Sequence, residues 1–411
     1  LFSLPRALGL VALIVGVLGV IPGMPHIAFL SLAAMLGYVS FKLSVAAKEA
    51  PASAEEVVPA AAGDGDASWE DVQPVDILSL EVGYKLIQLV DKSNGGDLLM
   101  RIKGVRRKFA QEIGFLPPPV HVRDQLDLRP NNYRIGLKGV TVGTGEAYPG
   151  MWLAIDPGHA DVRLNGMQTR DPAFGLNAYW IQSSEKDMAQ AAGYTVVDAS
   201  TVVATHLHHL MQLYAWRLLG RGEAQQLLDH LAQYSPKLVE EVVPKLVPIP
   251  MFQKVLQNLI KEQIPIRDLV TIFEALADYG KLSRSVDFLT ERARESLSRL
   301  ISLKIQGEDG VITAATLSPN WEQKIMASMD GDLARGWQLN MDPREVQKMI
   351  AAISRAVDDM LAKGHTPVLL VHPNVRLIVR RLIEGSVANV FVVSYNEIAH
   401  GIQIKTVGMV E

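Results

Sequence analysis

The residues best suited to chemistry in this sequence are three histidines close together, His206, His208 and His209. On a helix, His206 and His209 occupy neighbouring positions, a spacing that could bring two imidazoles to one metal ion. No carboxylate stands at a spacing that would complete such a site. We therefore interpret these histidines as structural residues, and we expect neither a metal nor a cofactor.

Other catalytic patterns do not occur in the sequence. There is no P-loop and no Gly-x-Ser-x-Gly motif. Gly143-Thr144-Gly145 begins like a dinucleotide-binding loop, but Tyr148 stands where the third glycine should be, so we interpret it as a turn between strands. Cysteine is absent, which excludes disulfides, cysteine-bound zinc, iron–sulfur clusters and thiol nucleophiles. We expect a protein that is not an enzyme.

Length and charge limit the function further. The 411 residues are enough for two or three domain cores at the usual ~150 residues each. With 40 basic and 44 acidic residues the formal net charge is -4, so we expect no nucleic acid as partner. One basic group falls largely on one face of a predicted helix, which favours a solvated surface: Arg101, Lys103, Arg106, Arg107 and Lys108.

Apolar residues are concentrated at the beginning of the chain. Two apolar runs, 7–21 and 24–41, are separated by Pro22-Gly23, which predicts a transmembrane helical hairpin within residues 1–48. The second run argues against a signal peptide. Arg6, Lys42 and Lys48 lie at the outer ends, so the large C-terminal part should be cytoplasmic. Because Leu1 lies close to a membrane helix, we expect a piece of a longer protein.

Residues 49–76 have the composition of an acidic flexible linker. Eight carboxylates and no basic residue occur in this range, and Ala, Pro and Gly fill most of the rest. Trp69 is the exception, because a large aromatic residue in a polar tether favours docking on a surface. With Asp66 and Asp71 beside it, Trp69 is predicted to dock, either on its own module or on an adjacent subunit.

Beyond residue 76 the pattern predicts a mixed α and β module. Two helices are expected at 82–90 and 102–113, then strands at 120–123, 133–137, 140–142, 151–155 and 178–181. The range 200–303 has the pattern of a helical bundle interrupted by prolines. The last part is predicted to be α/β, with a helix starting at Asp342-Pro343 and ending at Lys363-Gly364, followed by strand, helix and strand at 367–371, 375–384 and 390–393.

Gly83 lies inside the first predicted helix. Glycine costs about 1 kcal/mol against alanine in a helix, so its presence indicates close packing or a hinge between subdomains.

Several long blocks of the sequence carry a family resemblance: 22–26, 109–118, 120–124, 132–135, 138–140, 171–176, 196–207, 219–221 and 265–268. They resemble the large membrane subunit of the bacterial flagellar export gate, a member of the type III export-gate family. The resemblance extends along essentially the whole chain, is weakest after residue 303, and favours the flagellar branch over the injectisome relatives.

The resemblance implies an inner-membrane protein whose cytoplasmic module assembles into a ring, of nine subunits in the family. The implied partners are flagellar export chaperones with their cargo, other membrane subunits of the export apparatus and the export ATPase complex. Four subdomains are implied: an α+β one at 77–149 plus 199–218, a small inserted α+β one at 150–198, a helical one at 219–298 and an α/β one at 299–411.

The resemblance also implies a chaperone-binding dimple between the first two subdomains. Phe174 is the apolar residue most expected to be exposed there, with Asp171 and Thr205 at the rim. For the other lining positions an ordinary core role stays open, most of all for Ile155 and Val202. The remaining lining positions are Pro157, Leu176 and Val197.

Three alternative functions stay open. An injectisome export-gate homologue would share the fold but bind other substrates. A purely structural ring scaffold would have no affinity for export chaperones. A membrane-tethered enzyme would need a cleft with perturbed acid and base residues, which no motif supports.

Overall fold

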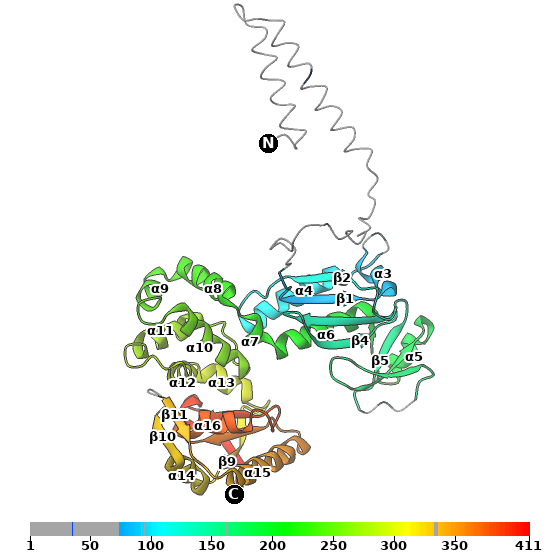
Figure 1. The fold of residues 1–411 in the computed structure, drawn as a ribbon. Helices are drawn as coiled ribbons and strands as arrows, with labels where there is room; N and C mark the ends of the chain where they lie inside the picture. The colour runs from blue at the N-terminus through cyan, green and yellow to red at the C-terminus, as the bar shows by residue number, and fades with distance from the viewer. Residues whose placement is uncertain are drawn as a thin grey trace, which may run out of the picture. The chain divides into compact units, whose positions relative to one another are not determined.

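The computed structural model describes residues 74–411 apart from 92, 94, 159, 161, 162 and 333–335, and Met35 before them. The predicted membrane hairpin and the linker up to residue 73 lie outside the described residues, apart from Met35. Within the described part of the chain, no helix is long and apolar enough to cross a membrane. Residues Pro74–Glu411 form one compact unit (Figure 1).

The first sheet has the strand order β2-β1-β3-β4. Strand β1 (Leu78–Val82) runs parallel to β2 (Val120–Asp124) and antiparallel to β3 (Asn132–Leu137), which forms a hairpin with β4 (Val140–Glu146). Every second side chain of β1 is buried in the core that the sheet shares with helices α4 (Leu98–Ile113) and α6 (Ala199–Leu213) (Figure 1). The three predicted strands of this region, 120–123, 133–137 and 140–142, are confirmed.

The predicted helix at 82–90 is confirmed for residues 84–90 and wrong at its start. The chain forms β1 up to Val82, and only then a 3-10 turn η2 (Tyr84–Leu86) and a short helix α3 (Ile87–Val90). The helical spacing of Val82, Leu86 and Val90 hid the strand alternation that ends at Val82. Gly143-Thr144-Gly145 is likewise not a turn, because it lies within β4.

The inserted segment, residues 152–198, builds a second sheet with the order β6-β7-β5-β8. Its strands are β5 (Trp152–Ile155), β6 (Met167–Arg170), β7 (Asn177–Ile181) and β8 (Thr195–Asp198), and η4 (Ser183–Glu185) and α5 (Lys186–Ala191) connect β7 to β8. Strands β5 and β8 are antiparallel, with Trp152 opposite Asp198, so the segment begins and ends at the same place. Strands β5 and β7 were predicted, whereas β6 and β8 were not.

A run of helices follows α6. Helix α7 (Ala215–Leu218) connects to the helical segment, residues 221–305, which agrees with the predicted bundle apart from the unpredicted α9 that starts at Pro236. Its helices are α8 (Arg221–Tyr234), α9 (Pro236–Val242), α10 (Ile249–Lys261), α11 (Leu269–Tyr279), α12 (Val286–Ser296) and α13 (Ser298–Ile305).

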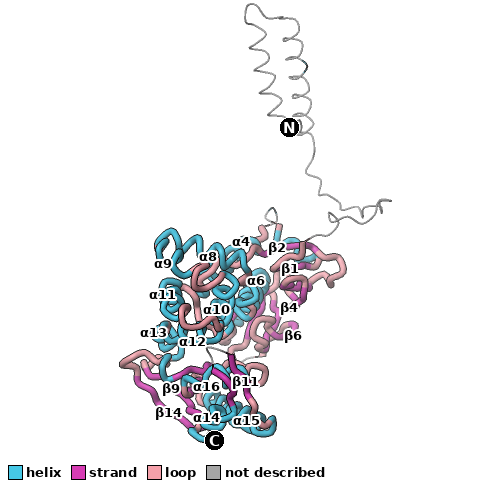
Figure 2. The backbone as a smooth tube through the Cα atoms, turned by 60° about the vertical axis from the view of Figure 1, so that its left-hand side comes forward, coloured by secondary structure: helices cyan, strands magenta, loops and turns pink. Residues whose placement is uncertain are grey.

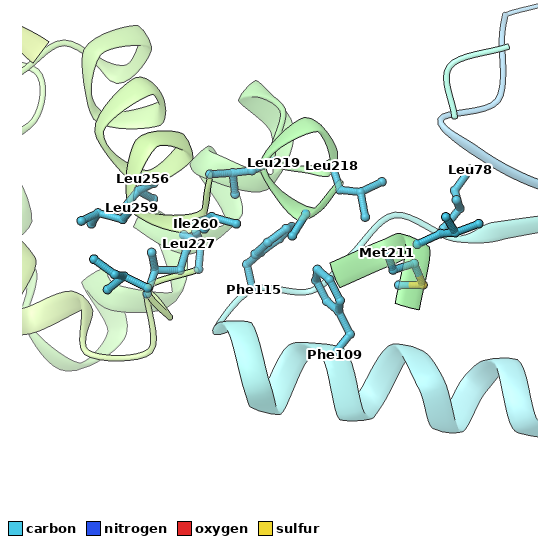
Figure 3. Packing of buried hydrophobic residues seen from close by; sticks show 14 of the residues in the cluster. Leu78, Phe109, Phe115, Met211, Leu218, Leu219, Leu227, Leu256, Leu259 and Ile260 are labelled. Atoms are coloured by element: carbon cyan, nitrogen blue, oxygen red, sulfur yellow. The ribbon is translucent and has the colours of Figure 1, made fainter. Parts of the chain in front are cut away.

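The first sheet and the helical segment share one continuous hydrophobic core. Phe109 and Phe115 lie between Leu218 on one side and Leu259 of α10 on the other (Figure 3). At the end of α4 the N–H of Ile266 donates to the carbonyl of Ile113 at 2.7 Å. The two parts are therefore joined by both apolar packing and backbone hydrogen bonding.

The C-terminal segment, residues 311–410, contains a parallel sheet with the order β13-β12-β9-β14. It also has a short β10-β11 hairpin, with its helices beside the strands (Figure 2). The elements are β9 (Val311–Leu317), α14 (Pro319–Ser328), β10 (Met329–Asp332), β11 (Gly336–Leu339), α15 (Pro343–Ala362), β12 (Val368–Val371), α16 (Pro373–Ile383), β13 (Phe391–Ser394), η5 (Tyr395–Glu397) and β14 (Gln403–Val410).

The predictions for this last part are confirmed in detail. The Asp342 carboxylate accepts the N–H of Arg344 at 2.8 Å, and Pro343 is the first residue of α15. Strands β12 and β13 are parallel and joined through α16, as the strand–helix–strand pattern predicts. The subdomain boundaries at 149, 198, 218 and 298 stay predictions.

Candidate partner-binding surface

The loop between β6 and β7, residues 171–176, is closed by hydrogen bonds to Asp171. The backbone N–H of Asp171 donates to the carbonyl of Leu176, and the N–H of Gly175 donates to the carbonyl of Asp171, each at 2.8 Å. The Asp171 carboxylate accepts the N–H of Phe174 at 2.7 Å. Gly175 has φ +71°, a conformation that favours glycine. The closed loop leaves the side chains of Phe174 and Leu176 exposed to solvent.

Helix α6 supports this loop from the side. The rings of Phe174 and His209 meet edge to face, with centroids 5.3 Å apart. Thr205, which is half-buried, lies one helical turn before His209 on α6. Although the side chain of Phe174 is 61% exposed, its ring is in contact with His209. An exposed aromatic ring beside an imidazole can accept an apolar side chain and orient it by a hydrogen bond.

A buried polar group lies beneath the surface. The hydroxyl of Tyr133 and Nδ1 of His206 form a hydrogen bond of 2.9 Å, and both residues are buried. Burial, with the nearby Asp171 carboxylate, raises the pKa of Tyr133. Burial, with the nearby His209, lowers the pKa of His206 to about 4. His206 is thus a neutral, hydrogen-bonded residue of the core at physiological pH.

An open pocket of about 270 Å³ lies beside the loop, between the first sheet and the inserted segment. Thr144 and Glu146 of β4 form one wall, and Leu153, Trp180 and Asp171 belong to the inserted segment. Asp171 itself is only 4% exposed. Among the residues that the structure describes, no group of three or more histidine and carboxylate side chains is placed to hold a metal ion.

The other residues that the resemblance implies are spread over different depths. Pro157 is exposed, and Ile155 in β5 and Val197 in β8 are half-buried against the main core. Val202 on α6 is 2% exposed and belongs to that core, so it lies beneath the surface and not on it. The structure thus brings Asp171, Phe174 and Leu176 together in one loop that contacts α6, the helix that also carries Thr205, and it places Val202 in the interior.

His209 is the residue of this surface that sequence reasoning missed. It was weighed as a metal ligand and interpreted as a structural residue, although its position four residues after Thr205 places both on one face of α6. Tyr133 was recognised only as a strand residue.

Gly83 directly follows Val82, the last residue of β1. Its N–H donates to the carbonyl of Asn132 at 2.8 Å, and an added Cβ would lie 2.2 Å from the carbonyl oxygen of Arg129. The structure therefore gives a packing reason for glycine here, and the hinge stays a prediction.

The predicted linker contacts Asp66, Trp69 and Asp71 lie outside the described residues. The last linker residue, Asp76, is held at the sheet edge by His121 at 2.6 Å and by Arg123 at 2.7 Å, both of β2. The chain therefore enters the compact unit beside β2.

Comparison with known sequences places these features in a family context. The model of the FHIPEP family matches residues 1–403. The chain is 43% identical to the flagellar biosynthesis protein FlhA of Escherichia coli over 98% of its own length and 58% of that protein. It is 36% identical to FlhA of Bacillus subtilis over 100% of its length and 61% of that protein. The chain thus spans about three fifths of the length of these relatives.

Solved structures with the same fold extend over most of the described residues. The CdsV protein of Chlamydia pneumoniae superposes with a TM-score of 0.74 at 28% identity, covering 83% of this chain and 100% of that one. CdsV in its complex with CdsO gives a TM-score of 0.73 at 28% identity, over 83% and 99%. The nonameric SctV-C of EPEC superposes with a TM-score of 0.66 at 20% identity, covering 82% of this chain and 99% of that one. At this identity the likeness shows the fold alone.

Proposed function

The chain belongs to the FHIPEP family, and from this premise we propose that it is the export-gate component of a bacterial flagellar type III secretion apparatus. In this proposal the compact unit, residues 74–411, receives complexes of an export chaperone with its cargo and passes the cargo to the membrane gate. The high identity to relatives named as flagellar biosynthesis proteins supports the flagellar branch over an injectisome homologue.

The observation that carries the proposal is the exposed Phe174 on a closed loop. Large apolar side chains are costly to leave in water unless a partner covers them, and two exposed ones, Phe174 and Leu176, lie in the same loop. Asp171 fixes the loop backbone and His209 contacts the ring. A partner therefore meets an ordered apolar surface, which lowers the entropy cost of binding.

We further propose that the compact units assemble into a ring below the membrane. The related SctV-C is nonameric, and its fold is that of residues 74–411. The acidic linker with Trp69 would contact the neighbouring subunit. The apolar runs before it would anchor the ring in the bacterial inner membrane, with the compact unit in the cytoplasm.

Two further groups of partners belong to the proposal. CdsV has been solved in complex with CdsO, so a protein with this fold does bind a second protein. For the present chain we expect contacts with other membrane subunits of the export apparatus and with the export ATPase complex.

Binding of purified residues 74–411 to flagellar chaperone–cargo complexes tests the proposal. This range is compact by itself, and it corresponds to nearly the whole of the solved CdsV chain. Isothermal titration calorimetry should show saturable binding to a chaperone–cargo complex and none to the free chaperone of an injectisome. Ring formation without chaperone binding would support the structural scaffold and contradict the proposal.

A further inference from the structure

Four charged residues are buried, and a fifth is nearly buried, where the helical segment meets the C-terminal segment. Arg376 of α16 has an exposed side-chain fraction of 0%, and Glu397 of η5 has 1%. On the other side are Arg294 with 3%, Glu291 with 7% and Glu262 with 12%, from α12 and the end of α10. Burying charges is costly unless each has a partner of opposite sign. The contacts of this charge cluster therefore define how the two segments fit together.

Arg376 reaches from the C-terminal segment into the helical segment. Its Nε donates to Oε2 of Glu291 at 2.6 Å, and its Nη2 binds the other oxygen of the same carboxylate. Its Nη1 and Nη2 donate to Glu262 at 2.7 Å and 3.2 Å. One guanidinium thus pairs with two carboxylates from two different helices, with the planar geometry in which arginine binds most strongly.

Arg294 reaches in the opposite direction. From α12 of the helical segment its Nε binds the Glu397 carboxylate of the C-terminal segment, and its Nη1 donates to Glu262 at 3.0 Å. Glu262 therefore accepts from both arginines. Each segment provides an arginine to a carboxylate of the other, so neither segment can shift without breaking bonds of both.

The same arginines cover the edge of the C-terminal sheet. Strand β13 is the outermost strand, and the carbonyl of Val392 accepts from Arg376 at 3.3 Å and from Arg294 at 3.4 Å. Arg380 donates to the carbonyl of Val390 at 3.4 Å. Side chains from α12 and α16 thus occupy the place of a further strand at this edge.

Further bonds cross the same boundary around the charge cluster. The hydroxyl of Ser302 in α13 donates to the carbonyl of Glu397 at 3.4 Å and accepts the N–H of Ala399 at 2.9 Å. Arg381 of α16 binds Asp287 of α12 at 2.6 Å. The adjacent guanidiniums of Arg294 and Arg376 outweigh burial and lower the pKa of Glu262 to about 2, so this carboxylate stays charged at any physiological pH.

We propose that the charge cluster locks the helical segment and the C-terminal segment into one rigid body. Partial sliding of one segment against the other would leave charged groups buried without partners. Intermediate positions are therefore unfavourable, and the two segments keep one relative position. Conformational changes of the compact unit must then occur at other boundaries. The proposal does not depend on the identity of any binding partner.

Distance measurements by double electron–electron resonance test the lock directly. The natural sequence has no cysteine, so Lys254→Cys on α10 and Asp358→Cys on α15 place one spin label in each segment. Both positions are exposed. We expect one narrow distance distribution that does not change between about 50 mM and about 500 mM salt, because buried pairs are weakly screened. A broad or two-peaked distribution would overturn the proposal.

Substitutions at the charge cluster complete the test. Arg376→Met should broaden the distance distribution about twofold or more, because Glu291 and Glu262 lose their partner and water enters the joint. Arg355→Met on α15 is the matched control, since Arg355 is exposed, and it should leave the distribution narrow. An unchanged distribution in Arg376→Met would show that apolar packing alone sets the joint. If Arg376→Met does not fold, Arg294→Met is measured against the same criterion.

Discussion

The ring of Phe174 and the imidazole of His209 meet edge to face between two consecutive segments of the chain, with centroids separated by 5.3 Å. Phe174 belongs to the inserted segment, and His209 belongs to α6, the helix that shares its core with the first sheet. This contact links the exposed end of the 171–176 loop to a long helix. The proposed chaperone site is thus shared between two parts of the compact unit.

Replacing Phe174 should weaken chaperone–cargo binding without unfolding the protein. A central aromatic contact typically contributes 2 kcal/mol or more to binding, roughly a 30-fold change in affinity. Because Phe174 is 61% exposed, Phe174→Ala should change the free energy of unfolding by only about 0.5 kcal/mol. Calorimetric titration and thermal unfolding measure the two effects. Met188→Ala, at another exposed apolar position of the inserted segment, is the control. A large drop in melting temperature with unchanged affinity would contradict the prediction.

The stability of the compact unit should rise with pH between about 4 and about 6.5 because of His206. Burial lowers the pKa of His206 to about 4, so in this window the unfolded state binds more protons than the folded state. This contribution of His206 to the free energy of unfolding is fully present above about pH 6.5 and is lost as the pH falls toward about 4. Its upper limit is on the order of 3 kcal/mol. Urea unfolding of wild type and His206→Gln across this window measures it. Parallel pH curves for the two proteins would show that His206 does not contribute.

Gly83→Ala should destabilise the compact unit. The added Cβ would lie 2.2 Å from the backbone oxygen of Arg129, and backbone atoms cannot move aside cheaply, so we expect a loss of roughly 2 kcal/mol or more. Gly104→Ala in α4 is the control, because nothing lies within 4 Å of its added Cβ, and it should stabilise by about 0.5–1 kcal/mol. Chemical denaturation distinguishes the two.

The hinge prediction for Gly83 needs a separate measurement. If Gly83 also permits movement between subdomains, a bulkier residue should change the export rate and narrow the spread of subdomain orientations. Destabilisation with export rate and orientations unchanged would leave close packing as the whole role of Gly83.

Trp69→Ala should reduce ring formation by a protein that contains the linker and the compact unit. The aromatic side chain is the predicted anchor, so its loss removes a contact that joins neighbouring subunits at high effective concentration. Helical content and melting of the monomer should be unchanged. Mass photometry over a concentration series measures the ring population. Equal populations for both proteins would make the linker a simple tether.

Local signals predicted the C-terminal segment well. Asp342 and Pro343 start α15, and the apolar run 367–371 forms β12. The same kind of signal failed at Leu78 and Leu80, because their alternation is short and continues directly into residues with helical spacing. Short strands such as β6 and β8 carry few apolar residues, so their place depends on pairing with neighbours that the sequence does not reveal.

The site and the charge cluster show what local patterns miss. Phe174 and Asp171 were found through family resemblance, and His209 was missed because its contact with Phe174 is made only in the folded chain. Arg376 and Glu291 are 85 residues apart in the sequence. Each would be placed on a solvated helix face by itself, and only the fold shows that they bury one another.

The pairing of Trp152 with Asp198 makes the inserted segment a separable cassette. Because the first and last strands of this segment are neighbours, the chain enters the segment after β4 and leaves it into α6 at adjacent backbone positions, so a segment of different length can take its place. Grafting the cassette from a relative onto this chain should transfer partner preference while the scaffold remains the same.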